Sequence, residues 1–307
     1  MSGPRVAAVV VTFNRRELLL ESLHAITHQE RAPDEVIVVD NASTDGTAAA
    51  VRTAYPDVRL LEPARNTGGA GGFALGLSAA LEAAAELVWL MDDDTVPEPG
   101  ALAALLEARG DYPGVRPVVL ASRVVWTDGR AHPMNTPRRK PMVRRAELER
   151  AGRVGCTPIR SASFVSILVD AQECRGRGGP VADYFLWNDD FEFTTRLLRR
   201  RIGLLCPSSV VVHKTRTFGA TDADPGERFF YEVRNKVWML TRSRALTPLE
   251  RVLYGGSTLR RWLRTFARSH DRRTLARSLR RGLAAGLRHR PRSNEEVFAG
   301  VGVASTP

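Results

Sequence analysis

The stretch LVWLMDDD, residues 87–94, joins five apolar residues to three consecutive aspartates. A short apolar run of this kind is typical of a strand that is buried on both faces of a parallel sheet. Three adjacent carboxylates repel one another, so their position directly after the strand indicates a ligand site. Side chains two apart on a strand point to the same side, and Asp92 and Asp94 are therefore candidates for sharing one divalent cation. The alternative is an N-cap cluster for a helix after Pro97.

Around this stretch the first 121 residues alternate strand and helix patterns. Expected strands are 6–11, 36–39, 58–61, 87–91 and 118–121, and expected helices are 16–28, 47–54, one ending near 85, and 97–107. This order predicts an α/β fold whose mostly parallel sheet is flanked by helices. Ligands bind such sheets beyond the carboxyl ends of the strands, where Asp40 and Asp92 fall.

The later part of the chain is less regular. Residues 123–160 are rich in Pro, Gly and charge, which predicts a long functional or disordered connection. A strand at 164–169, a helix at 190–200 and a strand ending at His213 follow. The apolar stretch 73–91 contains Glu82 and Glu86, which makes a transmembrane helix unfavourable. The three cysteines form no CxxC pair, which argues against a zinc ribbon or a disulfide scaffold and favours a reducing compartment.

A glycine-rich run, RNTGGAGGFALG, occupies residues 65–76. Residues 69–74 fit the dinucleotide pattern GxGxxG/A, and an NAD-dependent oxidoreductase is one alternative. That pattern belongs after a first strand, however, and this run follows the third. The glycines permit close approach of a ligand to the backbone, and a helix N-terminus attracts phosphate. The alternative is a flexible turn.

Two further candidates lie in the second half of the chain. In residues 185–192, FLWNDDFE, the adjacent Asp189 and Asp190 beside bulky apolar side chains are expected to have perturbed pKa values, which suits a general base. They also fit the acidic first turn of a helix. His213 closes an apolar strand, where a structural role is the alternative to metal ligation.

The net charge of +11 is concentrated at the C-terminal end of the chain. Residues 240–307 hold 15 Arg and 4 acidic residues, so residues 1–239 are neutral overall. We therefore expect a main domain at 1–239 and an Arg-rich helical tail at 240–307. Two apolar series fit amphipathic helices: Leu259, Trp262, Leu263 and Phe266, then Leu275, Leu279, Leu283 and Leu287. Packing on the main domain and contact with an anionic membrane surface both explain them. Nucleic acid is not expected, because no stacking aromatics or nucleic-acid-binding motif accompany the arginines.

Taken in order, residues 11–15, 39–46, the aspartate triplet, the acid pair and His213 resemble family 2 glycosyltransferases of GT-A fold. The glycine run and residues 89–94 are more specifically similar to actinobacterial galactofuranosyltransferases that build cell-wall galactan on a polyprenyl-diphosphate carrier. Residues 228–235 resemble an aromatic, Arg-Asn segment that these enzymes share with rhamnosyltransferases.

The resemblance implies a role for each matching position. Thr12 and Arg15 would lie by the nucleotide of a UDP-sugar, Asp40 would contact the uracil, and Asn66, Gly69 and Asp93 would border the donor. Asp92, Asp94 and His213 would hold Mn²⁺ or Mg²⁺. Asp190 would be the base, with Asp189 and Trp187 at the pocket of a lipid-linked glycan acceptor. In this family's pattern a Trp often directly precedes the paired acids, whereas Asn188 intervenes here.

One base without a second nucleophilic carboxylate predicts direct displacement with inversion. The resulting hypothesis is a metal-dependent galactofuranosyltransferase that uses UDP-galactofuranose. The chain has no signal-peptide pattern, and we expect a cytoplasmic enzyme, peripheral at the inner face of the plasma membrane through its basic tail. Alternatives are a dTDP-rhamnose-dependent rhamnosyltransferase on a lipid-linked acceptor, and a membrane- or nucleic-acid-binding module with a degenerate sugar-nucleotide domain.

Overall fold

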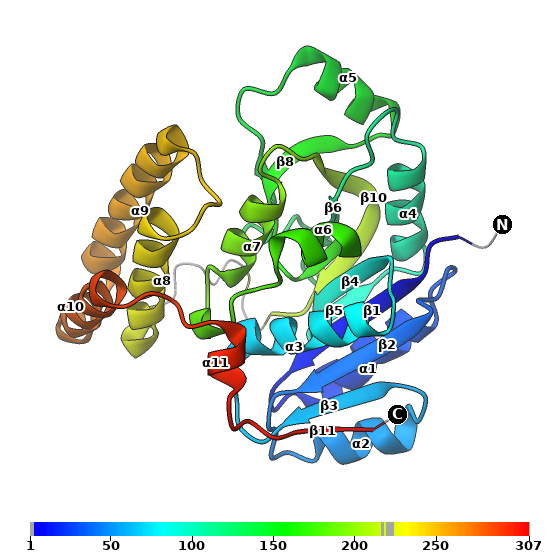
Figure 1. Ribbon diagram of the computed structural model, residues 1–307, viewed down its shortest axis with the longest axis horizontal. Coiled ribbons are helices and arrows are strands. Elements are labelled where there is room, and N and C mark those ends of the chain that lie inside the picture. Colours follow the sequence, from blue (N-terminus) through cyan, green and yellow to red (C-terminus); the bar gives the residue numbers. More distant parts are fainter. Residues whose placement is uncertain (1–2, 216–217, 219–223, 307) are drawn as a thin grey trace.

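The computed structural model describes residues 3–215, 218 and 224–306, and its centre is a single mixed sheet (Figure 1). Neighbouring strands follow the order β11 (Val303–Ser305), β3 (Arg59–Pro63), β2 (Glu35–Asp40), β1 (Val6–Thr12), β4 (Leu87–Asp92), β9 (Ser166–Asp170), β6 (Val119–Val125), β10 (Gly203–His213), β8 (Thr157–Ser161) and β7 (Arg138–Arg139). β5 (Thr95–Pro97) pairs with β10 outside this path. The strands β3, β2, β1 and β4 are mutually parallel, as the sequence pattern predicts, whereas β9 runs antiparallel to β4 and β6.

Helices cover both faces of the sheet. They are α1 (Arg16–Thr27), α2 (Thr47–Ala54), α3 (Gly68–Glu82), α4 (Ala101–Gly110), α5 (Arg145–Arg153), α6 (Ala171–Arg177) and α7 (Asp189–Leu197). Apolar residues of α1, α2, α4 and α5 share one buried cluster with alternate residues of β1 and β2. Residues of α3, α6 and α7 share the other cluster with the intervening strand residues. The expected α/β fold is therefore confirmed, and its strands read as near-continuous apolar runs because both sheet faces are buried.

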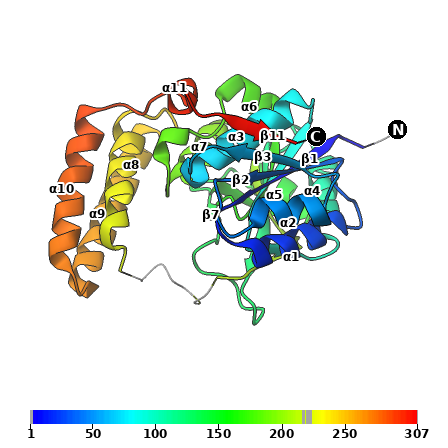
Figure 2. The same ribbon diagram turned by 90° about the horizontal axis from the view of Figure 1, so that it is seen from below.

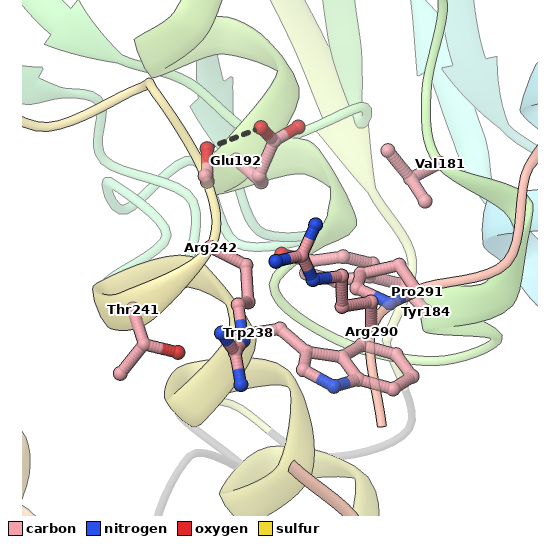
Figure 3. Close-up of a pocket in the computed structure, with 9 residues that line it drawn as sticks. Val181, Tyr184, Glu192, Trp238, Thr241, Arg242, Arg290 and Pro291 are labelled. Carbon is pink, nitrogen blue, oxygen red and sulfur yellow. Dashed lines mark hydrogen bonds between the residues drawn. The ribbon is translucent and has the colours of Figure 1, made fainter. Parts of the chain in front are cut away.

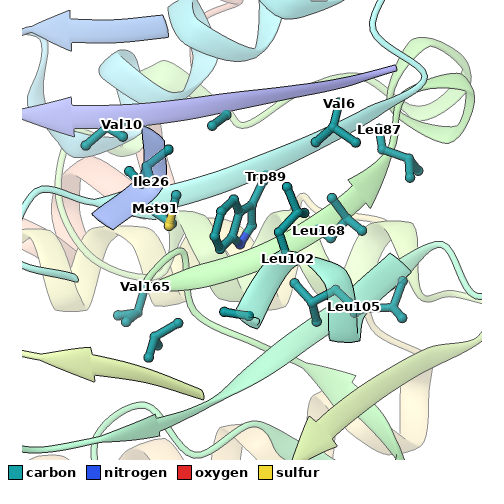
Figure 4. Packing of buried hydrophobic residues seen from close by; sticks show 14 of the residues in the cluster. Val6, Val10, Ile26, Leu87, Trp89, Met91, Leu102, Leu105, Val165 and Leu168 are labelled. Atoms are coloured by element: carbon teal, nitrogen blue, oxygen red, sulfur yellow. The ribbon is translucent and has the colours of Figure 1, made fainter. Parts of the chain in front are cut away.

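Trp89 of β4 belongs to one of these clusters, where its ring lies near Met91, Leu102 and Leu168 (Figure 4). Its side chain is fully buried, and its indole Nε1 donates to Oγ of Ser166 on β9 at 2.9 Å. Burial of an aromatic side chain of this size is worth roughly 2–3 kcal/mol, provided that its N–H group finds a partner. The bond fixes β4, and with it the aspartates at the end of β4, against the antiparallel strand.

The connection predicted at residues 123–160 is wrong in part, because this segment contains regular structure. β6 continues to Val125, and β7, α5 and β8 follow before the next predicted strand. α5 buries only Glu147 and Ala151, so its sequence carries little apolar periodicity. Glu147 forms an ion pair with Lys140 at 2.7 Å. Lys140 directly follows β7, so this pair connects α5 to β7. The helix expected at 97–107 begins at Ala101 instead, because residues 95–97 pair with β10.

The C-terminal part forms a helical group at one side of the sheet (Figure 2). It comprises α8 (Phe229–Thr241), preceded by the 3₁₀ turn η3 (Gly226–Arg228), then α9 (Pro248–Arg268) and α10 (Arg272–Arg288). The short α11 (Asn294–Phe298) packs instead near α3 and the 3₁₀ turn η1 (Ala182–Tyr184). Leu275, Leu279 and Leu283 of α10 pack with Phe229 and Val233 of α8. The helices predicted in the tail are present, and α8 extends across the predicted boundary at 239/240.

The chain returns to the main sheet after α11. Residues of β11 pair antiparallel with β3, with Ala304 opposite Glu62. Arg292 also reaches η1, where its guanidinium donates to the carboxylate of Asp183 at 2.7 Å. Across residues 3–215, 218 and 224–306, no helix combines the length and the apolar character needed to cross a bilayer.

Candidate functional site

The aspartate triplet lies at the carboxyl end of β4, with Asp92 as the last residue of the strand. Asp93 and Asp94 are buried, and each is 5% exposed. One oxygen of Asp92, one of Asp94 and one ring nitrogen of His213 lie within 4.8 Å of one another. His213 ends β10, which pairs with β5 immediately after the triplet. The fold therefore brings together the three residues predicted as metal ligands.

Thr12, which ends β1, and Arg15, which follows it, hold Asp93 and Asp94 in place. Arg15 donates to Oδ1 of Asp93 at 3.1 Å and to Oδ2 of Asp94 at 2.6 Å. Thr12 donates its hydroxyl to Oδ2 of Asp93 at 2.8 Å. β1 is the parallel neighbour of β4, so these side chains meet at the same edge of the sheet. Arg15 is 49% exposed, which leaves part of its guanidinium accessible from outside.

His213 is oriented by a residue that the sequence analysis did not identify. Its Nε2 lies 2.9 Å from Oδ1 of Asp94, and its Nδ1 lies 2.9 Å from Oδ1 of Asn135. Asn135 in turn donates its amide to Ser163 at 3.2 Å, which sets the orientation of its carbonyl oxygen. Nδ1 must then donate to Asn135, so in the neutral imidazole Nε2 carries the lone pair. Metal-ligating histidines are commonly fixed in this manner.

The electrostatics of the group favour a cation. Burial and the neighbouring Asp94 raise the pKa of Asp92 to about 7, and burial raises that of Asp93 to about 6 although Arg15 opposes the shift. Burial works against ionisation of His213, but its hydrogen bond to Asp94 and that charge raise its pKa on balance. Oδ1 of Asp94 is buried and, when Nε2 of His213 carries a lone pair, accepts no hydrogen bond from any of the described residues. Nε2 of His213 and Oδ1 of Asp94 are then two acceptors that face each other, and the carboxylate of Asp92 lies beside them. Such a group fits a divalent cation that takes oxygen and imidazole ligands.

The predicted nucleotide-side residues lie at the ends of the neighbouring strands. Asp40 ends β2, is 2% exposed, and accepts from the amide of Ser43 at 2.9 Å; burial raises its pKa. Asn66 is half-buried, and its side-chain oxygen accepts from the amide of Gly68 at 2.7 Å. Asn41, beside Asp40, binds Thr67 and Gly68 through its amide group. The loop before α3 is thus tied to the end of β2.

Most of the glycine run is explained by packing. Gly68 has φ +75°, and a Cβ there would lie 2.1 Å from the carbonyl oxygen of Phe185. A Cβ at Gly72 would lie 2.4 Å from Val11, and one at Gly76 would lie 2.3 Å from Val9. The spacing of four lets α3 lie directly on β1. A Cβ at Gly69 would meet no atom within 4 Å, so this glycine alone faces open space.

The loop before α7 is strained and tightly held. Phe185, Trp187 and Asn188 have φ values of 62°, 66° and 66°, which non-glycine residues seldom adopt. Asn235 on α8 is fully buried and donates its amide to the carbonyls of Tyr184, Leu186 and Trp187 at 2.8–2.9 Å. The Arg-Asn segment seen in the sequence therefore fixes this loop, and Trp187 stays 38% exposed at the surface. Backbone strain of this kind is typical of functional sites.

Asp189 and Asp190 begin α7 and differ in their surroundings. Asp189 is buried, and burial together with the charge of Asp190 raises its pKa well above the ordinary value. Burial also raises the pKa of Asp190, while the amide of Phe191 and the charges of Lys236 and Arg138 oppose the rise. Asp190 lines a pocket of about 160 Å³ between α7, α8, β8 and residues 134–138. This environment keeps Asp190 as the more readily ionised acid of the pair.

The acid pair and the triplet face a common region. Asn135, which contacts His213, also lines the pocket of Asp190. The charge of Asp92 contributes to the raised pKa of Asp189. Residues separated by about a hundred positions in sequence are thus close enough to interact electrostatically.

A second pocket, of about 380 Å³, lies between α7, α8 and residues 290–291 (Figure 3). Tyr184, Trp238, Arg242 and Arg290 line it together with Glu192, which accepts a 2.6 Å hydrogen bond from Ser243. None of the predicted site residues is among its lining residues.

Comparison with known proteins finds one matching family model and several relatives. The model of the family described as "Glycosyl transferase family 2" matches residues 7–167. The chain is 31% identical over 254 residues to galactofuranosyltransferase GlfT1 of Mycobacterium tuberculosis, which covers 77% of this chain and 82% of the relative. It is 49% identical to GlfT1 of Mycolicibacterium smegmatis over 92 residues, 30% of each chain.

Among solved structures, the mannosyltransferase PcManGT from Pyrobaculum calidifontis, in complex with GDP-Man and Mn²⁺, superposes with a TM-score of 0.55. The match covers 98% of this chain and 80% of that protein at 23% sequence identity. The likeness extends through the C-terminal helices, and it confirms the glycosyltransferase type of fold that the sequence resemblance implies.

Proposed function

Because the chain belongs to glycosyl transferase family 2, we propose that it transfers galactofuranose from UDP-galactofuranose to a polyprenyl-diphosphate-linked glycan, with inversion, in the assembly of cell-wall galactan. The resemblance to galactofuranosyltransferases supports the choice of sugar. The observation that carries the proposal is the metal-binding group of Asp92, Asp94 and His213 beside the pocket of Asp190.

At the donor side, Asp92, Asp94 and His213 would hold Mn²⁺ or Mg²⁺. The ion would act as a Lewis acid and offset the charge that develops on the leaving diphosphate. Thr12 and Arg15 keep Asp93 and Asp94 in position, and the exposed part of Arg15 is available to the diphosphate. Asp40 at the end of β2 would bind the uracil, and Asn66 and Gly69 would border the sugar.

At the acceptor side, Asp190 is the general base. The acceptor hydroxyl attacks the anomeric carbon, its proton passes to the Asp190 carboxylate, and the bond to UDP breaks. Asp189, which burial holds toward its protonated form, would donate a hydrogen bond and not compete for the proton. The exposed ring of Trp187 would stack on the acceptor sugar.

The C-terminal helices support contact with a lipid surface. One face of α9 exposes Leu249, Val252, Leu253, Leu259 and Leu263, of which Val252 is 72% and Leu263 64% exposed. Trp262 and Phe266, which adjoin Leu259 and Leu263 on the helix surface, pack toward Phe229 and Val233 of α8. Exposed arginines of α9 and α10, such as Arg260 and Arg277, add a favourable term of about 1 kcal/mol each near anionic lipids. We place the enzyme in the cytoplasm, peripheral at the inner face of the plasma membrane.

The test is a screen of nucleotide sugars with the full chain and Mn²⁺, with UDP-galactofuranose and dTDP-rhamnose as the decisive pair. Release of UDP that depends on a lipid-diphosphate glycan supports the proposal. Turnover of dTDP-rhamnose alone would establish the rhamnosyltransferase alternative. A chain that turns over neither sugar in the presence of metal would refute a transferase of either kind.

A further inference from the structure

Lys236 has a buried side chain whose amine has no hydrogen-bond or ion-pair partner among the described residues. It lies on α8, is 5% exposed, and lines the same pocket as Asp190. In the described part of the chain its Nζ forms no hydrogen bond and no ion pair. It lies over the ring of Phe191, whose centroid is 4.7 Å away. An ammonium group has three donors, and burial without acceptors is unfavourable. Burial accordingly lowers the pKa of Lys236 to about 8.

Two arginines line the same pocket. Arg138 of β7 lies over the rings of Phe191 and Tyr254, at 5.1 and 5.5 Å from their centroids, and has no ion pair among the described residues. Arg261 of α9 pairs with Glu232. Three cations from β7, α8 and α9 therefore face a pocket in which Asp190 supplies the one carboxylate among the described lining residues.

Asp190 does not neutralise Lys236 directly. One of its oxygens accepts from the amide of Phe191 at 2.6 Å, and no ion pair joins it to Nζ. The cationic side chains come from separate elements that the fold places around one small cavity. Retaining an unpaired buried lysine costs stability, which is expected where a ligand supplies the missing acceptors.

From this arrangement we infer that the pocket beside Asp190 binds a phosphate or diphosphate group through Lys236 and Arg138. The inference rests on the proposed function, in which both substrates carry a diphosphate. The group belongs either to the lipid-linked acceptor or to the leaving nucleotide. Its oxygens would accept from the ammonium of Lys236 and from the guanidinium of Arg138, whose planar donors suit phosphate.

Calorimetric titration of the full chain with inorganic pyrophosphate in EDTA tests this site without any transfer reaction. Lys236→Met and Arg138→Met are each expected to raise the Kd by about tenfold or more, the usual effect of losing charged hydrogen bonds. Arg139→Met is the matched control, because Arg139 is the next residue of β7, is exposed and does not line the pocket. It should leave the Kd unchanged.

Thermal unfolding separates a binding role from a structural one. Lys236→Met removes an unpaired buried charge, so the melting temperature of the unliganded protein should stay the same or rise. A lower melting temperature would show that the ammonium stabilises the fold and would overturn the inference. Equal pyrophosphate binding by wild type and both pocket variants, or none by wild type, would also overturn it.

Competition identifies the source of the group. If UDP, at a concentration that saturates its own site in EDTA, abolishes pyrophosphate binding, the pocket holds the leaving diphosphate. If pyrophosphate still binds, the pocket holds the acceptor's diphosphate. Either result stands even if the nucleotide-sugar screen fails, so the two proposals are tested separately.

Discussion

Nδ1 of His213 lies 2.9 Å from Oδ1 of Asn135, and this contact sets which nitrogen of the imidazole faces the aspartates. The two residues are 78 positions apart in the chain. Asn135 also borders the pocket of Asp190, so one residue contacts the candidate metal group and lines the pocket of the candidate base.

Asn135→Ala should weaken Mn²⁺ binding by about 10–100-fold, the usual effect of losing an outer partner of a metal-bound histidine. The imidazole would then adopt either tautomer and lose its fixed orientation. Manganese binding measured by electron paramagnetic resonance checks this. Ser163→Ala, which removes only the more remote contact, is expected to have a smaller effect. Unchanged affinity in Asn135→Ala would mean that His213 does not ligate the ion.

Manganese affinity should increase with pH between about pH 6 and pH 8. Burial and Asp94 raise the pKa of Asp92 to about 7, and contact with Asp94 raises that of His213. Protons on these groups compete with the cation, so affinity is low below their pKa values and rises as they are lost. We expect at least about a tenfold increase over this range. A flat profile, measured by calorimetry in several buffers, would contradict the assigned ligands.

Asp190→Asn should reduce transfer by about 10²–10⁴-fold while leaving UDP binding nearly unchanged. The amide preserves the shape of the side chain but cannot accept the acceptor's proton. Asp189→Asn is the matched comparison: burial favours the protonated form of Asp189, which an amide resembles. We expect it to retain most of the activity in steady-state assays. The reverse order of effects would exchange the roles of the two acids.

Asn235→Ala should destabilise the protein by roughly 2–4 kcal/mol, because the carbonyls of Leu186 and Trp187 lose this donor and that of Tyr184 loses one of its donors. Chemical denaturation gives this value. Asn294→Ala removes an amide that contacts Pro180 and Ala182 at a less buried position, and its effect should be smaller. If Asn235→Ala lowers the free energy of unfolding by less than Asn294→Ala does, the conformation of the loop before α7 does not depend on Asn235.

Replacing both Leu259 and Leu263 by Gln should reduce co-sedimentation with vesicles that contain anionic lipid. These two side chains are 58% and 64% exposed, so the change removes exposed apolar area from α9 and leaves Trp262 and Phe266 in place. Val115→Gln, at a residue 72% exposed in the loop after α4, is the control and should bind as wild type. If the double variant keeps full vesicle binding but changes the oligomeric state, the exposed face joins copies of the chain instead.

The strands and the aspartate triplet were predictable because their signal is local. An apolar run of five or six residues followed by acids needs no distant information, and β1, β2 and β4 form as expected. Asp92 and Asp94 follow from the same run. Strand β9 was expected too, but its antiparallel insertion between β4 and β6 was not, because pairing direction depends on the whole path of the chain.

Asn135 and Lys236 escaped prediction for a different reason. Asn135 lies in a segment whose Pro and Arg content is typical of a loop. No pattern near it in the sequence predicts its contact with a histidine 78 positions later. Lys236 occupies one polar position on an amphipathic helix, where an exposed lysine is the ordinary expectation. Only the tertiary structure shows that it is buried. The glycine run was detected, but its spacing of four reflects the contact of α3 with β1.

Strand β11 limits how the C-terminal residues can be studied. Its backbone groups occupy the free side of β3, with Val303 opposite Pro63 and Ser305 opposite Leu61. A chain shortened at residue 240 would lack β11 and leave β3 as an exposed edge strand, which could pair with strands of other molecules. Such a fragment would be prone to aggregate, and its failure to sediment cleanly with or without vesicles would say nothing about lipid. Point substitutions on α9 avoid that confusion.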